Sequence, residues 1–532
     1  MQLSRRRFLW VIGGVTVSVP FVALASGCSA APGEVVPSAT ATAGSGGFEA
    51  LDEVGQTGRV LRSQTARPTP FTRPLPLPSP LVPVRTGSDG DDYELVARRG
   101  TAQILDERET PVWGFDGTFP GPLFETRRGR AANVRLTNEL PVPIVRHLHG
   151  AFTPAASDGY PLDYVLPVSG PGDHHLHPGG TVHDGSFTYA HPMQQRAALL
   201  WYHDHRMDFT GPQVWAGLAG LHVHRDDEER ALGLPVGDHE LTLLLTDRSF
   251  AADGSFLYPA LDPDLAHTPG VLEPFANGVL GDTLLVNGIH APYHRVKQGT
   301  YRLRIANGSN AREYRLSVDP LPPTGEPFVQ IGTDGGLMAA PAVRRSLSLA
   351  PAERVDVVAD FTGYPEGSVV RLTNLAGGDG TTDVIEFRVG GKDDRPRWIA
   401  PDVLSQIEVL NAADAVRTRT FAFARVPTSD GVQFHIGHRA FDPDAIEADP
   451  RAGETEIWEF SSDLAHPVHI HNAHFQVLDA GGPTAWKDVV RLGPRDKKRV
   501  IVRFDSYPGT YVFHCHNLEH EDMGMMANFV IG

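Results

Sequence analysis

Short segments in which apolar and polar residues alternate begin near Tyr93 and continue to the C-terminus. Val134-Arg135-Leu136-Thr137-Asn138 and Tyr301-Arg302-Leu303-Arg304-Ile305 are two of them, and a glycine precedes each. Alternation with a period of two places one face of a strand in a core and leaves the other face polar. Because no long amphipathic helical pattern stands out, the sequence predicts an all-β protein.

Related segments recur along the chain. One reads Val112-Trp113-Gly114-Phe115-Asp116-Gly117, a second reads Leu285-Val286-Asn287-Gly288, and a looser third reads Ile457-Trp458-Glu459-Phe460. Copies spaced by about 150–170 residues indicate a repeated domain. We therefore expect three β-sandwich domains, at residues 71–228, 238–392 and 400–532.

The N-terminal segment has the character of an export signal. Residues 1–27 contain no acidic side chain and place three consecutive arginines before an apolar stretch that two glycines and a proline interrupt. This pattern resembles a twin-arginine signal peptide and argues against a permanent membrane helix. The ending before Cys28 is similar to a lipoprotein cleavage site, with Cys28 as the lipidated residue; the alternative is ordinary cleavage near Ala30. We expect a periplasmic or other extracytoplasmic protein, with membrane anchoring through Cys28 where that cysteine is lipidated.

Residues 28–70 are rich in Ala, Ser, Thr, Gly and Pro, which predicts a flexible tether between the N-terminal segment and the folded domains.

The composition of the whole chain excludes some classes of function. The net charge of −17 argues against a nucleic-acid partner, because phosphates would be repelled. Only 2 cysteines stand beside 24 histidines in the 532 residues, so a disulfide scaffold is excluded and imidazole chemistry is favoured. We expect a monomer.

The histidines gather in four short motifs. The first predicted domain carries two His-x-His pairs, and the third carries two further motifs: 147–149, 203–205, 466–471 and 514–516. Residues i and i+2 of a strand share a face, so each pair presents two imidazoles side by side. In His514-Cys515-His516 the thiolate faces the opposite way. One strand can therefore bind metal on both sides.

The residue types favour copper. A thiolate, two imidazoles and a weak Met ligand form the blue-copper set, and Cys515, His520 and Met525 provide it locally with His466 from a distant strand. The other eight imidazoles, without carboxylates, suit copper better than calcium or magnesium. Zinc is an alternative for any His/Cys group, and a single His-x-His can be structural. The matching place in the second domain, residues 306–312, lacks histidine, so we expect no metal there.

With these motifs, and with the runs at 328–336 and 349–354, the chain resembles the multicopper oxidases from about residue 70 onward. The resemblance is nearest to the bacterial group of the spore-coat laccase, bilirubin oxidase and phenoxazinone synthase. It implies three cupredoxin-like Greek-key domains and four copper ions. One type 1 copper would lie in the third domain, and a cluster of one type 2 and two type 3 coppers between the first and third domains.

The resemblance also implies a ligand for each position. Type 1 copper takes His466, Cys515 and His520, with Met525 axial. Type 2 copper takes His147 and His469. The two type 3 coppers take, respectively, His149, His203 and His516, and His205, His471 and His514.

The implied activity is laccase-like. A small aromatic donor, such as a phenol or an aromatic amine, would be oxidised one electron at a time at type 1 copper, through the outer edge of His466 or His520. Dioxygen would be reduced to water at the trinuclear cluster, with Cys515 as the path between the two. Glu521 and Asp158 match acids with proton-delivery roles; the alternative is that each only orients a ligand imidazole.

Two other functions compete with this interpretation. A cuprous or metal-ion oxidase for copper tolerance often carries Met-rich segments, and this chain has 7 Met with no Met-rich insert. A copper-free cupredoxin scaffold requires lost ligands, and none is lost.

Two histidine features stand outside the four motifs. The loop His174-His175-Leu176-His177, with His183, is either an accessory copper site or a solvated turn, and its Gly/Pro surroundings favour the turn. For His474, packing or hydrogen bonding is the default role.

Overall fold

The computed structural model describes residues 57–532 except 171, 430, 479–480 and 482–483. The expected signal peptide, the lipidation site Cys28 and the tether up to residue 56 lie outside the described residues. Within the described part of the chain, no helix has the length and apolar character needed to span a membrane.

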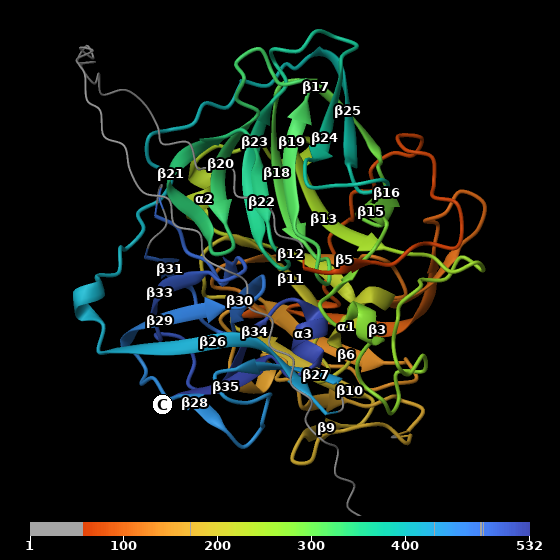
Figure 1. Cartoon of the computed structure of the whole chain (residues 1–532). Coiled ribbons are helices and arrows are strands. Elements are labelled where there is room, and N and C mark those ends of the chain that lie inside the picture. The colour runs from red at the N-terminus through yellow and green to blue at the C-terminus, as the bar shows by residue number, and fades with distance from the viewer. Residues whose placement is uncertain (1–56, 171, 430, 479–480, 482–483) are drawn as a thin grey trace, which may run out of the picture. The chain divides into compact units, whose positions relative to one another are not determined.

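The first domain is a sandwich of two sheets (Figure 1). One sheet has the order β10-β6-β3-β2, with β4 also paired to β3; the bounds are β2 Arg85–Thr86, β3 Gly90–Ala102, β4 Thr110–Phe115, β6 Ala131–Asn138 and β10 Ser186–His191. The other has the order β5-β12-β11-β7, with β5 Gly121–Arg127, β7 Arg146–His149, β11 Ala198–Asp204 and β12 Ala219–Arg225. A small parallel pair joins β8 Asp163–Val165 to β9 Thr181–His183.

The second domain repeats this plan with larger sheets. The seven-stranded sheet runs β16-β15-β13-β18-β23-β20-β21, with β13 Glu240–Arg248, β15 Thr283–Val286, β16 Ile289–His290, β18 Thr300–Asn307, β20 Phe328–Thr333, β21 Gly336–Arg344 and β23 Arg354–Asp360. The five-stranded sheet runs β17-β25-β24-β19-β22, with β17 Tyr293–Gln298, β19 Tyr314–Asp319, β22 Leu347–Leu349, β24 Val369–Asn374 and β25 Asp383–Lys392.

The third domain has two five-stranded sheets. The first runs β27-β26-β29-β33-β31, with β26 Arg417–Thr428, β27 Gly431–Ile436, β29 Thr455–Ser462, β31 Phe475–Val477 and β33 Lys497–Arg503. The second runs β28-β35-β34-β30-β32, with β28 Ile446–Ala448, β30 His466–Ile470, β32 Val489–Leu492, β34 Gly509–Cys515 and β35 Met526–Ile531. The histidine-bearing strands β30 and β34 are neighbours.

Helices are short and lie at connections. The α-helices are α1 Thr210–Ala216, α2 Asp227–Ala231 and α3 Leu518–Asp522. The 3-10 turns are η1 Ala155–Ser157, η2 Gly237–His239, η3 Glu273–Phe275 and η4 Ala412–Asp414. Helix α1 of the first domain contacts α3 of the third, because the Asp522 carboxylate accepts hydrogen bonds from the backbone N–H groups of Thr210 and Gly211.

The all-β prediction with three sandwich domains is confirmed, and the alternation has the expected cause in β6, where Val134 and Leu136 are buried and Arg135 is exposed. Strand β18 differs, because it is buried on both faces. Its Arg302 and Arg304 are covered by α2, whose Glu229 accepts a hydrogen bond from Arg304. A strand whose sequence alternates between apolar and charged residues is thus buried on both faces, because its charged side chains are paired.

The start of the folded body lies earlier than the sequence suggested. Strand β1, Arg59–Val60, pairs in parallel with β14, Val279–Leu280, and Leu75 joins the core of the second domain. The expected tether therefore extends too far, and residues 71–76 do not belong to the first domain's sandwich. Backbone N–H groups of residues 59–75 donate to backbone carbonyls of the second domain. The composition of residues 59–75 does not reveal these partners.

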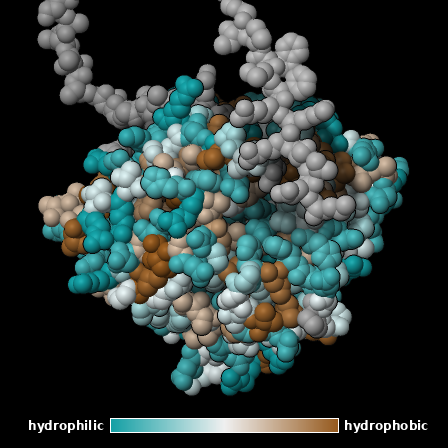
Figure 2. All heavy atoms as spheres, turned by 60° about the horizontal axis from the view of Figure 1, so that its bottom comes forward, coloured by the Kyte–Doolittle hydropathy of each residue, from teal (hydrophilic) through white to brown (hydrophobic). Residues whose placement is uncertain are grey.

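The surface shows no large apolar face in the view of Figure 2, where hydrophobic residues form separate small patches among hydrophilic ones. Exposed apolar side chains such as Val82 and Ile399 are far apart in the sequence. Scattered exposure of this kind is ordinary for globular domains.

Candidate metal centres

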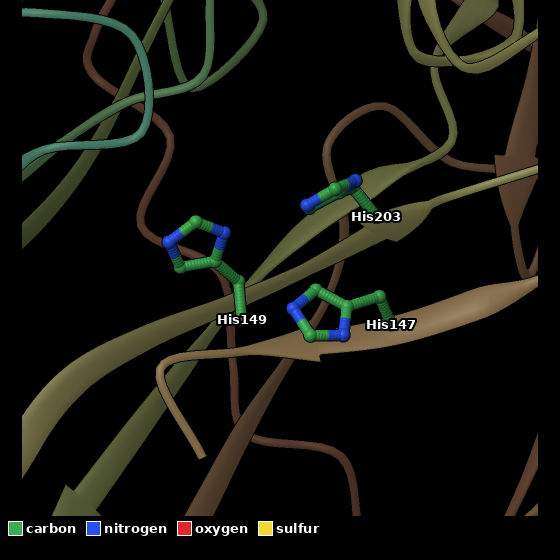
Figure 3. A group of neighbouring side chains, drawn as sticks. All are labelled: His147, His149 and His203. Atoms are coloured by element: carbon green, nitrogen blue, oxygen red, sulfur yellow. The ribbon is translucent and has the colours of Figure 1, made fainter. Parts of the chain in front are cut away.

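Neighbouring strands bring the first-domain histidines together. Strands β7 and β11 pair antiparallel with His147 opposite His203. The ring centroids of His147, His149 and His203 lie 5.5–5.8 Å apart, and Figure 3 shows two of these rings on one strand and the third on its neighbour. His205 follows the end of β11, with its ring 5.4 Å from that of His147.

The third domain supplies four more imidazoles to the same place. His469 on β30 is paired with His514 on β34, while His471 and His516 follow the ends of those strands. The rings of His149 and His469, from different domains, stack at 3.7 Å between centroids. All eight histidine residues are at most 1% exposed. The structure thus brings together the whole set that the resemblance implied for a trinuclear cluster.

The thiol lies on the other side of β34, as the strand geometry predicts. Cys515 Sγ is 3.4 Å from His466 Nδ1 and 3.6 Å from His520 Nδ1, and these two nitrogens are 3.0 Å apart. Met525 is fully buried in the same apolar cluster as Cys515. Burial raises the pKa of the Cys515 thiol well above its ordinary value, so a thiolate here requires a cation beside it.

Several imidazole nitrogens in the eight-histidine cluster fit a metal, since they are buried without a hydrogen-bond partner among the described residues. They are Nε2 of His147, His203 and His469, Nδ1 of His149, and both nitrogens of His516. Buried polar atoms are normally satisfied, so these lone pairs indicate a missing partner. Burial also lowers the pKa of His203 and His469 to about 3, which keeps them neutral, as metal ligands must be.

Hydrogen bonds on the outer side of the rings set which nitrogen faces inward. Nδ1 of His147 donates to the carbonyl of Asp158 at 2.6 Å, and Nδ1 of His203 donates to that of Asp204 at 2.8 Å. Both leave Nε2 as the inward lone pair. His149 is reversed, because its Nε2 lies 3.2 Å from Asp488 Oδ1, which leaves Nδ1 inward.

Two acids identified from the sequence touch this cluster. Asp158 Oδ2 accepts a hydrogen bond from His471 Nδ1 at 2.7 Å, and burial raises the pKa of Asp158 well above its ordinary value. Glu521 Oε1 accepts from Thr210 Oγ1 at 2.7 Å, and its Oε2 lies 3.1 Å from His514 Nδ1. The two acids therefore reach the imidazoles from separate elements, the turn after η1 and helix α3.

Comparison with known proteins supports the same assignment. Residues 96–229 and 405–532 each match a family model described as multicopper oxidase. The chain is 34% identical to a laccase of Bacillus subtilis, covering 86% of this chain and 97% of that protein. The chain belongs to the multicopper oxidase family. It is therefore a copper-dependent oxidoreductase that uses dioxygen, and its histidine groups are compatible with the four coppers of the family.

Other multicopper oxidases and their relatives show the same likeness. A bilirubin oxidase of Albifimbria verrucaria is 33% identical over 86% of this chain and 81% of that protein. The crystal structure of a multi-copper oxidase from Pediococcus acidilactici superimposes with a TM-score of 0.75 and 31% identity, covering 89% of this chain and 93% of that one. The likeness thus extends over all three domains.

Sequence reasoning missed a carboxylate that links two domains of this multicopper oxidase. Asp488, just before β32, is bound by Arg354 of the second domain, whose Nη1 and Nη2 donate to its two oxygens at 2.6 and 2.5 Å. Asp488 in turn contacts His149 through Oδ1, and its carbonyl accepts from His469 Nδ1 at 2.8 Å. The second domain therefore reaches the imidazole cluster through one buried ion pair. Arg354 lies in the run 349–354, but no local pattern connects it to Asp488.

The edges of His466 and His520 are more enclosed than we expected. Both residues are 0% exposed, because Phe434 stacks on His520 at 4.0 Å and Asp463 Oδ1 lies 3.0 Å from His466 Nε2. The Asp463 side chain is 39% exposed. Solvent therefore meets Asp463 rather than an imidazole edge.

The remaining histidine and asparagine features have defined contacts. His474 Nε2 donates to the carbonyl of Gly150 at 3.0 Å, which is the hydrogen-bonding role expected of it. In the second domain, Asn310 lies where the first domain has its first pair of histidines, and its Nδ2 donates to Glu519 Oε1 at 2.8 Å. Residues 306–312 of the second domain therefore hold helix α3 through this hydrogen bond.

Proposed function

We propose that this multicopper oxidase is laccase-like, oxidising phenols or aromatic amines one electron at a time and reducing dioxygen to water. The observation that carries the proposal is strand β34, where Cys515 faces His466 and His520 while His514 and His516 face the eight-imidazole cluster. The relatives named laccase and bilirubin oxidase support the donor class. Bound copper supplies the one-electron chemistry and the reduction of dioxygen.

We assign His466, Cys515, His520 and Met525 to type 1 copper. The cluster ligands then follow the family pattern: His147 and His469 for type 2, His149, His203 and His516 for one type 3 ion, and His205, His471 and His514 for the other. The last group has the best support from distances, because His514 Nε2 lies 3.3 Å from His205 Nε2 and 3.1 Å from His471 Nε2.

The protein's own groups prepare this chemistry in three ways. Cys515 is joined through the backbone to both His514 and His516, which gives a covalent path between the two kinds of site. Burial excludes bulk water from the eight imidazoles. Glu521 and Asp158 hold carboxyl groups against ligand rings, where each can keep a proton beside the cluster.

The test uses the full copper-loaded protein. Four coppers per chain, a Cu–thiolate absorption in the visible range and turnover of a dimethoxyphenol under air are expected. Cys515→Ser is expected to abolish the absorption and the turnover while copper remains at the cluster. A rate on Cu(I) far above the rate on the phenol would favour the metal-ion oxidase instead, and a colourless, copper-free protein would leave only the scaffold function.

We propose export by the twin-arginine route and lipidation at Cys28, on the sequence alone. Replacing Arg5 and Arg6 together by Lys is expected to retain the protein in the cytoplasm. Cys28→Ser is expected to leave export intact but release the protein from the membrane fraction. Mass spectrometry of the mature N-terminus distinguishes a lipidated Cys28 from cleavage near Ala30.

A further inference from the structure

Two imidazoles outside the copper motifs converge on one carboxylate oxygen. His175 Nε2 and His177 Nε2 lie 3.0 and 2.7 Å from Asp208 Oδ2. The two rings are nearly perpendicular, at 82°, with centroids 5.2 Å apart. The loop that we expected to be a solvated turn therefore places two histidines on a carboxylate that is only 12% exposed.

We propose that His175, His177 and Asp208 form a fifth metal site, separate from the four copper positions, for a divalent transition ion. Two neutral imidazoles and one carboxylate are a donor set for Zn²⁺ or Cu²⁺, with positions left open for water. The order of divalent affinities favours Cu²⁺ over Zn²⁺ when both are present.

The backbone of the loop is held in place at His175 and His177 by contacts from separate segments. The backbone N–H of His175 donates to the carbonyl of Ala266 at 2.6 Å, and Arg206 Nη2 donates to the carbonyl of His175 at 3.2 Å. The backbone N–H of His177 donates to the Tyr164 hydroxyl at 3.3 Å. A donor set fixed before binding loses little conformational freedom when the ion binds.

The proposed site differs from the eight-imidazole cluster in access, because the side chains of His175 and His177 are 36% and 27% exposed. An ion at this site exchanges with solvent.

Asp208 connects this site to the copper cluster. It follows the cluster histidine His205 by three residues, and between them Arg206 binds the His175 carbonyl. An ion bridging the loop to Asp208 stabilises the segment that leaves β11. Binding to the native state alone raises stability by mass action, so the unfolding temperature rises with the concentration of the ion.

The test begins with the four-copper holoenzyme, freed of excess metal and dialysed against Zn²⁺ or Cu²⁺. One additional ion per chain and a higher unfolding temperature are expected. The His175→Ala/His177→Ala double variant is expected to lose both effects. His183→Ala removes the histidine at the end of β9, which stacks on Phe187 and lies outside the proposed donor set. This variant is the matched control and is expected to retain both effects. Oxidation of the phenol and the Cu–thiolate absorption are expected to be unchanged in both variants.

A second measurement uses the unmodified protein, so its outcome does not depend on whether the double variant folds. Anomalous scattering from crystals soaked in Zn²⁺ is expected to give a peak between the three side chains. Cu²⁺ is expected to add one electron paramagnetic resonance signal that a large excess of Zn²⁺ suppresses. A peak elsewhere, no uptake beyond four ions, or equal uptake by the double variant would overturn the proposal and leave a triad of hydrogen bonds.

Discussion

At the scale of residues, the cluster depends on what each imidazole bonds to on its outer side. Carbonyls hold Nδ1 of His147, His203, His469 and His514, so that Nε2 faces inward. A carboxylate holds Nε2 of His149 and turns that ring around. A carbonyl can only accept a hydrogen bond, so it selects one tautomer and keeps it whether or not the site is loaded.

Glu521 is the residue whose side chain we expect to carry protons to the cluster. Glu521→Gln still accepts a hydrogen bond from Thr210 but cannot hold and release a proton, so the rate of dioxygen reduction is expected to fall by about 10²-fold. The measurement is kcat against pH at unchanged copper content. Glu519→Gln, a buried neighbour bonded to Asn310 and Tyr258, is the control. Equal rates for Glu521→Gln and the unmodified enzyme at every pH would remove Glu521 from this role.

We propose that Met525 sets the reduction potential at the proposed type 1 site. Met525→Leu removes a thioether that stabilises the oxidised ion, so the reduction potential is expected to rise. A redox titration followed through the Cu–thiolate absorption measures it. Met526→Leu, one residue on and also buried, is expected to leave the potential unchanged. A potential that stays constant in Met525→Leu would show that the thioether is not a ligand.

At the scale of elements, strand β34 keeps two sites apart, whereas the segment before β32 joins domains. Strand β34 separates two sites by alternation alone, since Cys515 faces away from His514 and His516. The segment before β32 contributes Asp488, which joins His149 of the first domain to Arg354 of the second. One carboxylate thereby couples elements of all three domains.

Asp488→Asn is expected to disturb the cluster from this element. The substitution removes the bidentate partner of the buried Arg354 guanidinium, whose remaining carboxylate neighbour is Asp334, with Oδ1 3.9 Å from Nη1. Loss of a buried ion pair costs about 3–5 kcal/mol of stability, and the substitution also weakens the hold on His149. Copper at the cluster, followed by electron paramagnetic resonance and copper content, is expected to fall while the Cu–thiolate absorption remains.

Two further variants distinguish the positioning of His149 by Asp488 from the pairing of Asp488 with the charge of Arg354. Adding Arg354→Met to Asp488→Asn removes the guanidinium that has lost its bidentate partner, while Asp334 keeps its ion pair with Lys487. Stability is expected to recover in part, while the copper deficit at the cluster persists. Glu313→Gln breaks the ion pair with Arg491 on β32 and is expected to leave the copper content intact. If the double variant regains full copper, Asp488 acts on stability only.

At the scale of the whole molecule, the sandwiches are joined by buried charge rather than by apolar packing alone. Glu229 in helix α2 and Glu240 on β13 meet Arg302 and Arg304 on β18. Arg225 on β12 donates to both Glu229 and Glu240, so this network links the end of the first domain to the sheet of the second. Burial acts to raise the pKa of Glu240, but the charges of Arg304, Arg225 and Arg302 outweigh it and lower the pKa to about 2.

The pKa of Glu240 predicts an acid-sensitive link between these domains. A carboxyl whose folded-state pKa lies below the ordinary 4.5 contributes stability above pH 4.5, and this contribution disappears as the pH falls toward 2. Glu240→Gln is expected to lower stability at pH 7 by about 3 kcal/mol and to flatten the loss between pH 4.5 and 2. Urea unfolding midpoints across that range measure both effects. The exposed Glu107→Gln is the control, and parallel curves for Glu240→Gln and the unmodified protein would contradict the prediction.

The sequence by itself determined the parts of the sites that depend on local geometry. Side chains alternate along any strand, so His514-Cys515-His516 must present its thiol opposite its imidazoles, and the structure shows this arrangement. The repeated strands and turns determined three sandwiches for the same reason. The proposed copper ligands could be named because the family resemblance assigns a role to each position in these short motifs.

Only the tertiary structure decided which distant residues meet. Asp488 lies 134 residues from Arg354 and 339 from His149, and no periodicity relates them. Burial of the arginines of β18, enclosure of His466 and His520, and the meeting of His175 and His177 with Asp208 likewise depend on partners from other segments. The alternation along a strand predicts which face of the strand a side chain occupies. The residue that the side chain contacts depends on how the domains pack, and packing is a property of the whole chain.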